Sequence, residues 1–413
     1  MRSLTTCIAI LLLLISPATA QTETAIVGAK IYTSPHAAPL TNATVILRDG
    51  KIAAVGPAAD LRPASTARVI DGKSLVVTAG FWNSHVHLLS PTMSQPPAQN
   101  AAALSAELEA MLTRWGFTTV FDIASLPGQA MALRQRIASG EVRGPNILTV
   151  DAPFYPDNGI PIYARELFEG QPSFEVGAPA AAAERARKQL HAGADGVKIF
   201  AGSIVGGDIG VLPMPLDAAK AVVAEAHRAG KPAFAHPSNL EGLNIAIDSG
   251  VDVLAHTTPD NGQLWSPELV ARIKAHDMAL IPSLTLWVVE LKKDNDPEAV
   301  IEKFVAVAQQ QLKAYSDAGG QILFGTDVGY TDAFDTTEEY RLMSAAGLTW
   351  QQILASLTTA PASRFGYAQK GRVETGMDAD LTILSADPAT DAKAFAKVAY
   401  AIRGGELIYE AKR

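Results

Sequence analysis

Six side chains able to bind divalent cations lie in or at the ends of short apolar runs of the sequence. They are four histidines, one lysine and one aspartate: His85, His87, Lys198, His236, His256 and Asp327. Imidazole nitrogens and carboxylate oxygens are common ligands of Zn²⁺ and related ions. Together with a lysine that can be carboxylated, they could hold two cations around one water, and this predicts a metal hydrolase.

His85 and His87 form a His-x-His pair at the end of a run that reads as a strand. Residues i and i+2 of an extended chain face the same side, so both imidazoles can reach one ion. An isolated pair of this kind could equally be two polar residues at a strand end. His236 and His256 each close another apolar run, and four imidazoles buried at one end of a fold need partners, which a metal supplies.

Asp327 and Lys198 complete the set. Asp327 closes the run ILFGTD, where a carboxylate could bind an ion and accept the proton of an attacking water as the catalytic base. Alternatively, it caps the following helix. Lys198 lies inside the apolar run GVKIF, where an uncompensated charge costs on the order of several kcal/mol, so the lysine is modified, salt-bridged or reaching the strand end.

The elements that would position these residues recur between about residues 76 and 330. Each consists of an Ala-rich amphipathic stretch, a stop that usually contains Gly, and a short apolar run. Glycine ends helices, and short apolar runs between such turns are typical of strands buried on both faces. We therefore predict an α/β fold built as a (β/α)₈ TIM barrel, whose catalytic residues come from the C-terminal strand ends. The eight predicted strands are the apolar ends of VVTAGFWNSHVH, RWGFTTVFD, NILTVD, HAGADGVKIF, HRAGKPAFAH, DSGVDVLAH, AHDMALIPS and DAGGQILFGTD.

The two flanks have a different character. Short strand-like runs joined by Asp-Gly turns lie within residues 25–75, and similar runs lie within residues 371–412. Neither flank could cover its own hydrophobic face, so we expect both termini to form one small β-sandwich. The predicted boundaries are a signal peptide at 1–20, the sandwich at 21–75 and 366–413, and the barrel at 76–365.

The first twenty residues have the pattern of a secretory signal, with Arg2, an apolar run at 8–15 and small residues before Gln21. Cleavage after Ala20 would give a periplasmic or secreted product. The apolar run is too short to span a bilayer, so no stable membrane insertion is expected. Cys7, the only cysteine, lies within the signal, so the mature protein would have no disulfides.

Charge and composition narrow the choice of partner. The formal net charge is −8, and no basic run occurs anywhere in the chain. We therefore expect no nucleic-acid partner, and a small-molecule or dipeptide substrate instead. The oligomeric state is left open, with a homo-oligomer among the alternatives.

The chain resembles the amidohydrolase superfamily, binuclear metal type with a carboxylated lysine, in the branch of imidazolonepropionase-like and prolidase-like enzymes. The His-x-His pair, the lysine of the fourth strand, the histidines of the fifth and sixth strands and the final aspartate match its pattern across nearly the whole mature chain. The resemblance implies two divalent ions, first of all Zn²⁺, with Mn²⁺, Co²⁺ or Fe²⁺ as alternatives. His85, His87 and Asp327 would hold the more buried ion. His236 and His256 would hold the more exposed one, and a CO₂-derived carbamate on Lys198 would bridge the two.

The chain departs from two patterns within that superfamily. Its deaminases carry His-x-x-Glu after a middle strand, whereas here Glu241 lies too far from His236 to fit this spacing. Its prolidase-like members often have a Tyr shortly after the fifth-strand histidine, where this chain has Ser238 and Asn239. Deamination is therefore disfavoured, and the substrate cannot be copied from the prolidase-like enzymes.

The predicted function is hydrolysis of an amide or peptide-like C–N bond by a hydroxide that bridges the two ions, with Asp327 passing its proton to the leaving amine. The same site could serve a lactonase, a carbamate hydrolase or a phosphotriester hydrolase. A barrel glycosidase would need paired carboxylates at strand ends, and a non-catalytic binding module is the remaining alternative.

Loops that follow the strands supply the candidate substrate contacts, although ordinary loop packing also explains aromatic residues there. The candidates are Tyr155, Asn239, Trp265, Trp287 and Tyr330. The long segment 154–177 is rich in Pro and aromatic residues and is a candidate lid. The Gly-rich segment 202–207 lacks a nucleotide-binding fingerprint and is interpreted as a close-approach loop.

Overall fold

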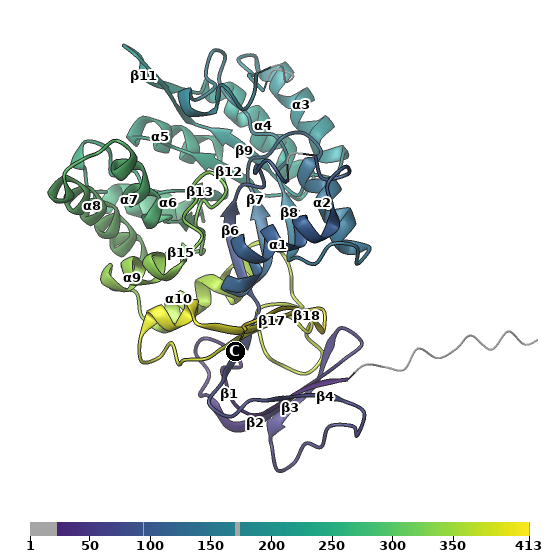
Figure 1. Cartoon of the computed structure of the whole chain (residues 1–413). Coiled ribbons are helices and arrows are strands. Elements are labelled where there is room, and N and C mark those ends of the chain that lie inside the picture. The colour runs from purple at the N-terminus through teal and green to yellow at the C-terminus, as the bar shows by residue number, and fades with distance from the viewer. Residues whose placement is uncertain (1–22, 94, 170–173, 413) are drawn as a thin grey trace, which may run out of the picture.

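The computed structural model describes residues 23–93, 95–169 and 174–412 (Figure 1). The predicted signal peptide lies outside the described residues. Parallel strands occupy the middle of the molecule with helices around them, and strands from both ends of the chain lie together beside this part (Figure 1). The architecture is mixed α/β, as predicted.

Eight parallel strands form the middle of the described structure, in a three-stranded sheet ordered β6-β7-β8 and a five-stranded sheet ordered β15-β14-β13-β12-β9. They are β6 (Phe81–Val86), β7 (Phe117–Asp122), β8 (Asn146–Thr149), β9 (Val197–Phe200), β12 (Ala233–His236), β13 (Val253–Ala255), β14 (Ala279–Ile281) and β15 (Gln321–Ile322). Each corresponds to one of the eight predicted strands. Because parallel strands buried on both faces are apolar throughout, their runs are recognisable in the sequence.

Backbone hydrogen bonds also link the two parallel sheets to each other. On one side, Ser84 in β6 donates to the carbonyl of Phe324, just beyond β15, at 2.7 Å. On the other side, Phe154, which follows β8, donates to the carbonyl of Lys198 in β9 at 2.8 Å. Between the sheets, the rings of Phe121 and Phe234 lie 4.8 Å apart within a buried apolar cluster.

Helices connect and cover these strands. They are α1 (Ala101–Met111), η1 (Thr113–Trp115), α2 (Gln129–Ala138), η2 (Ile162–Ala164), α3 (Pro179–His191), α4 (Leu216–Arg228), α5 (Leu240–Ser249), η3 (Asp260–Gly262), α6 (Pro267–Ala275), α7 (Leu284–Lys293), α8 (Glu298–Asp317), α9 (Thr337–Ala345), α10 (Trp350–Leu357), α11 (Thr359–Arg364) and η4 (Ala392–Ala396). Local sequence fixes several of their ends: Ser266 accepts a backbone hydrogen bond at the start of α6, and Gly250 ends α5 at φ +84°. Among the described residues, no helix combines the length and apolar character needed to cross a membrane.

Strands from both termini join in one eight-stranded sheet, ordered β18-β17-β16-β5-β1-β2-β3, with β4 paired to β1. The strands are β1 (Thr24–Ile31), β2 (Leu40–Arg48), β3 (Lys51–Pro57), β4 (Arg68–Asp71), β5 (Val76–Ala79), β16 (Leu381–Leu384), β17 (Val398–Arg403) and β18 (Glu406–Glu410). Val77 in β5 pairs with Ile383 in β16, and this pairing joins the two ends of the sequence. The two-layered sandwich expected here stays a prediction.

One further pair of strands was not predicted. Residues 202–207 were interpreted as a close-approach loop, whereas β10 (Gly202–Gly206) and β11 (Gly210–Pro213) form an antiparallel hairpin. The close approach itself is present, because a Cβ on Gly202 would lie 2.3 Å from the carbonyl oxygen of Pro237.

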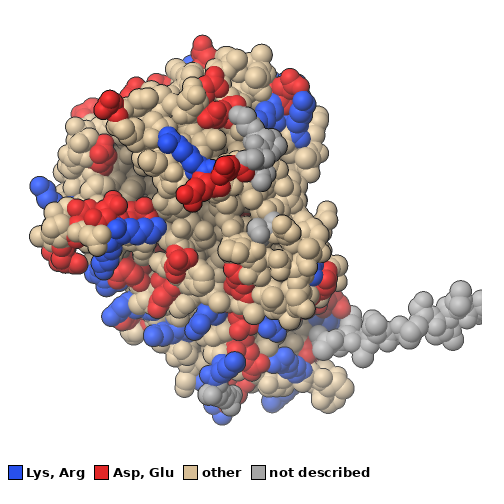
Figure 2. Space-filling model, turned by 45° about the horizontal axis from the view of Figure 1, so that its top comes forward, with Lys and Arg blue, Asp and Glu red and all other residues tan. Residues whose placement is uncertain are grey.

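The face turned forward in Figure 2 carries acidic and basic side chains interspersed with one another. No large uniformly basic area is visible on this face, in keeping with the net charge of −8. The expectation that no nucleic acid binds stays a prediction.

Candidate metal centre

The structure brings the six predicted ligands to the C-terminal ends of the parallel strands. His85 lies in β6, Lys198 in β9 and His236 at the end of β12. His87 and His256 directly follow β6 and β13, and Asp327 lies five residues beyond the end of β15. His256 and Asp327 have positive φ angles of 76° and 61°. Such backbone conformations are strained for residues other than glycine, and they concentrate at functional sites.

Asp327 is the centre of the cluster. Its Oδ1 lies 2.7 Å from His87 Nε2 and 3.0 Å from His85 Nε2, and its Oδ2 lies 3.6 Å from His256 Nε2. All three side chains are buried. Ligand atoms of His85, His87 and Asp327 lie within 4.8 Å of one another, close enough to share one ion.

The hydrogen bond of His87 on its other side tests whether a cation fits here. His87 Nδ1 lies 2.8 Å from the carbonyl oxygen of Ala124, so Nδ1 carries the proton and donates it to that oxygen. In the neutral imidazole, Nε2 then presents a lone pair to the carboxylate of Asp327. Two lone pairs at this distance repel unless a proton or a metal ion lies between them, so the donor set fits a bound cation.

The charges of these buried groups follow from their surroundings. Burial lowers the pKa of His85 to about 4 and that of His236 to about 3. For His87, burial lowers the pKa, but the hydrogen bond and charge of Asp327 raise it overall. Burial would raise the pKa of Asp327, but the imidazoles of His85 and His87 bring it well below its ordinary value. The site thus combines the neutral imidazoles of His85 and His236 with an ionised Asp327 carboxylate.

Lys198 and His236 extend the cluster away from Asp327. The His236 ring lies 5.0 Å from the His256 ring and stacks on Phe200 at 4.8 Å. Lys198 is 1% exposed, and no acidic side chain among the described residues lies within ion-pair distance of its nitrogen. Burial lowers the pKa of Lys198 to about 7, so much of its amine is uncharged near neutral pH.

A cavity of about 340 Å³ opens onto this cluster. Its walls include the predicted contacts Tyr155, Trp287 and Tyr330. The other two predicted contacts lie elsewhere: Asn239 accepts a hydrogen bond from the Gly242 amide at the start of α5, and buried Trp265 donates to Thr258. Neither is among the residues that line the cavity.

The cavity has further lining residues that sequence reasoning missed. They are mainly apolar or aromatic, with two carboxylates: Leu89, Ala124, Tyr163, Ala164, Leu167, Phe168, Phe200, Ile204, Ser238, Leu286, Glu290 and Asp294. Helical spacing could have found Glu290, because a residue three positions after Trp287 shares its helix face. Tyr163, Ala164, Leu167 and Phe168 belong to the candidate lid, so part of that segment lines the cavity.

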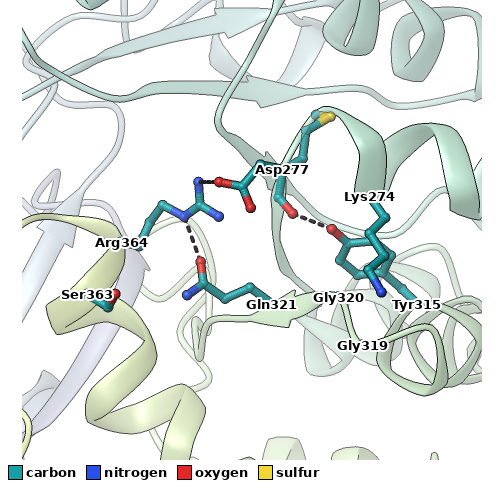
Figure 3. A pocket seen from close by; sticks show the side chains of 9 residues that line it. Lys274, Asp277, Tyr315, Gly319, Gly320, Gln321, Ser363 and Arg364 are labelled. Atoms are coloured by element: carbon teal, nitrogen blue, oxygen red, sulfur yellow. Dashed lines mark hydrogen bonds and ion pairs between the residues drawn. The ribbon is translucent and has the colours of Figure 1, made fainter.

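A second cleft, of about 460 Å³, lies at the opposite ends of β14 and β15 (Figure 3). Its cationic side chains already have partners. Arg364 donates to Gln321 at 2.6 Å and contacts Asp277 at 3.3 Å, and Lys274 donates to the carbonyl of Ala318. Because its charged side chains are paired with one another or with backbone and amide oxygens, we assign no chemistry to this cleft.

Comparison with known proteins finds similarity over most of the chain. The family model described as the Amidohydrolase family matches residues 76–408. Ochratoxinase of Aspergillus niger is 25% identical over 440 residues, which cover 95% of this chain and 88% of that protein. A candidate prolidase from Bifidobacterium longum has a TM-score of 0.79 at 26% identity, with 95% and 96% of the two chains covered. A Xaa-Pro dipeptidase with bound methionine has a TM-score of 0.78 at 22% identity, with 94% and 100% covered, and this last similarity concerns the fold alone.

Glu339 in α9 holds the helix that forms one wall of the cavity. Ser283 precedes α7 with φ +44° and makes no side-chain cap. Instead, the backbone amides of Leu284 and Thr285 donate to the carboxylate of Glu339 at 2.9 and 2.7 Å. Glu339 is 1% exposed, and burial raises its pKa to about 7 although these hydrogen bonds oppose the shift. A buried carboxylate thus caps the helix that carries Leu286, Trp287 and Glu290.

The raised pKa of Glu339 predicts a pH-dependent stability. The folded state binds this proton more tightly than the unfolded state, so the contribution of Glu339 is fully present below about pH 4.5 and is lost as the pH rises to about 7. Between pH 4.5 and 7, we expect the free energy of unfolding of Glu339→Gln to fall by up to about 3 kcal/mol less than that of wild type. Unfolding of the two proteins in urea from pH 4.5 to 7.5 measures the effect. Glu338→Gln is the matched control, because its pKa is lowered by Arg341. Parallel pH curves for wild type and Glu339→Gln would contradict the prediction.

Proposed function

The chain belongs to the amidohydrolase family, and we propose that it is a metal-dependent hydrolase that cleaves an amide or peptide-like C–N bond of a small molecule or dipeptide. The observation that carries the proposal is the buried convergence of imidazole lone pairs on the carboxylate of Asp327. A cavity large enough for a small substrate opens directly onto this cluster. The names of the similar proteins, an ochratoxinase and a candidate prolidase, are consistent with a hydrolase of this kind.

The proposal includes the fold that supports the site, a closed (β/α)₈ barrel. Hydrogen bonds from β6 to Phe324 and from Phe154 to β9 support closure on both sides. The contact between Phe121 and Phe234, from different sheets, supports a filled interior. In such a barrel the ends of non-adjacent strands face one opening, and this lets ligands distant in the sequence meet.

The residues divide into two groups by their contacts. His85, His87 and Asp327 would hold one divalent ion, and His236 and His256 would hold a second, with carboxylated Lys198 between them. Zn²⁺ suits the imidazole donors best. Carboxylation requires an uncharged amine and replaces the buried ammonium of Lys198 with a carbamate able to bind metal, which agrees with the absence of an acidic partner within the described residues.

Bound ions would polarise the scissile carbonyl and lower the pKa of an attacking water. Asp327 would accept the proton from that water and transfer it to the nitrogen of the leaving amine. The hydrogen bond to Ala124 would hold His87 in the required tautomer and orientation. The apolar walls of Phe168, Phe200 and Leu286 would exclude bulk water and strengthen these electrostatic interactions.

Metal removal and ligand substitution test this function. We expect chelator-treated protein to lose amide hydrolysis and to recover it when Zn²⁺ is added. His87→Ala should lower the bound metal measured by elemental analysis, and Asp327→Asn should reduce kcat about 10²- to 10⁴-fold because it removes both a ligand and the base.

His191→Ala, at the exposed end of α3, is the matched control and should keep both metal and activity. Hydrolysis of a broad amide panel that is unchanged in metal-free protein, or in both ligand variants, would overturn the proposal.

Carboxylation of Lys198 can be measured directly. Protein exchanged with ¹³C-bicarbonate should show one carbamate carbon in its NMR spectrum, because burial lowers the pKa of Lys198 to about 7 and its side chain lines the same cavity as the candidate ligands. Lys198→Met should lack the signal, and Lys188→Met on the exposed face of α3 should retain it. If metal-loaded, active protein lacks this signal, Lys198 does not hold metal as a carbamate.

We also propose that the protein is exported to the periplasm or secreted. The support is the pattern of residues 1–20, which lie outside the described structure: Arg2, an apolar run at 8–15 and small residues before Gln21. Protein recovered from an exporting bacterial host should begin at Gln21 by N-terminal sequencing, whereas a change that places a charge within the apolar run, Leu12→Arg, should retain the full-length chain in the cytoplasm. A wild-type chain that keeps Met1 and stays in the cytoplasm would contradict export.

A further inference from the structure

One face of α7 forms a wall of the cavity. Along the chain, this face changes from apolar side chains to acidic ones. Leu286, Trp287, Glu290 and Asp294 line the cavity from this helix and its end. Trp287 marks the inner end, because its ring lies 5.8 Å from the His256 ring and its Nε1 donates to Thr257. With a rise of about 1.5 Å per residue, Glu290 lies about 4.5 Å further out along the axis and Asp294 about 6 Å beyond Glu290.

Two tyrosines stand beside the first of these carboxylates. The hydroxyl of Tyr330 donates to Glu290 Oε2 at 3.0 Å. The Tyr163 ring lies 5.0 Å from the Tyr330 ring, and both line the cavity. The outer part of the cavity thus presents aromatic rings next to a carboxylate, a combination that attracts cations through both the ring faces and the charge.

The ammonium group of Lys293 already lies beside Glu290 and the Tyr330 ring. Lys293 Nζ lies 2.7 Å from Glu290 Oε1 and 4.9 Å from the centre of the Tyr330 ring. The Lys293 side chain is 51% exposed and is not among the residues that line the cavity. Glu290 and Tyr330 are therefore positioned to hold an ammonium, and the one they hold can move into solvent at little cost.

The charges of the cavity favour a cationic ligand over an anionic one. Apart from the metal centre with Lys198, the ionisable side chains that line it within the described residues are tyrosines and the two carboxylates, and no arginine is among them. Asp294 has no ion-pair partner among the described residues. A substrate carboxylate in the outer part would face Glu290 and Asp294, whereas a basic group would gain from both.

We propose that Tyr163, Tyr330, Glu290 and Asp294 form a subsite for a basic group of the substrate, an ammonium or guanidinium carried on an apolar chain whose amide lies at the metal centre. This inference rests on the proposed amide hydrolysis. The apolar part of such a substrate packs along Leu286 and Trp287. Its basic group replaces Lys293 between Glu290 and the Tyr330 ring.

A matched set of anilides tests the subsite in zinc-loaded protein. The 4-nitroanilides of 6-aminohexanoic, hexanoic and adipic acid have similar chains that end in a cation, a methyl group and an anion. We expect kcat/KM for the cationic anilide to exceed that for the anionic one at least tenfold. Glu290→Gln should reduce this ratio about tenfold, equivalent to one close ionic contact of about 1.4 kcal/mol. Lys293→Met should increase it, because the competing ammonium is gone.

The control is Glu184→Gln, an exposed helical glutamate that also pairs with a lysine, Lys188 at 2.6 Å. It should leave the ratio unchanged. If the anionic anilide is preferred and Lys293→Met abolishes that preference, the proposed subsite binds carboxylates through Lys293 and the proposal is wrong. Equal rates for the three anilides in wild type would also overturn it, while cleavage of the neutral anilide would still support amide hydrolysis.

A binding measurement separates the subsite from the reaction. Calorimetric titration with hexylammonium and with 1-hexanol measures the affinity of the proposed subsite for each ligand without any bond cleavage. We expect hexylammonium to bind at least tenfold more tightly than hexanol in wild type, and this difference to disappear in Glu290→Gln. Equal affinities for the two probes would overturn the subsite, whether or not the protein hydrolyses amides.

Discussion

The site depends on a contact that is unfavourable unless a proton or a metal ion lies between the two groups. Because Ala124 accepts the proton of His87 Nδ1, the opposite nitrogen turns its lone pair toward the carboxylate of Asp327 at 2.7 Å. Both side chains are buried, so water cannot relieve the repulsion. The metal ion that we propose for this site would remove the repulsion and would also make the site reactive.

Several features of the backbone keep these groups in place. His256 and Asp327 both adopt left-handed backbone conformations just beyond their strands. Two residues after Asp327, Gly329 lies against the main chain of His87, where a Cβ would come within 1.7 Å of the His87 carbonyl oxygen. The segments that carry His87 and Asp327 can approach this closely only because glycine stands there. On the cavity wall, Glu339 has a similar positioning role for α7.

The sequence predicted the eight parallel strands and the six residues at their ends, because both follow from local pattern: a buried strand is a continuous apolar run, and its end is marked by the first polar residue. Whether all six bind metal stays a prediction. Features that depend on packing between distant segments were less accessible. Asn239 and Trp265 follow strands, yet one caps its own helix and the other turns to Thr258. The hairpin β10–β11 was missed because its strands are short, glycine-rich and paired only with each other.

The pairing of Val77 with Ile383 places strands from the beginning and the end of the chain next to each other in one sheet. During synthesis, β16–β18 leave the ribosome long after β1–β5. The edge of β5 therefore stays unpaired until β16 has been made. Contacts between such distant segments slow folding. Completion of this sheet consequently requires synthesis to have passed β16–β18, and a chain that ends before these strands would expose an unpaired edge to proteases and chaperones.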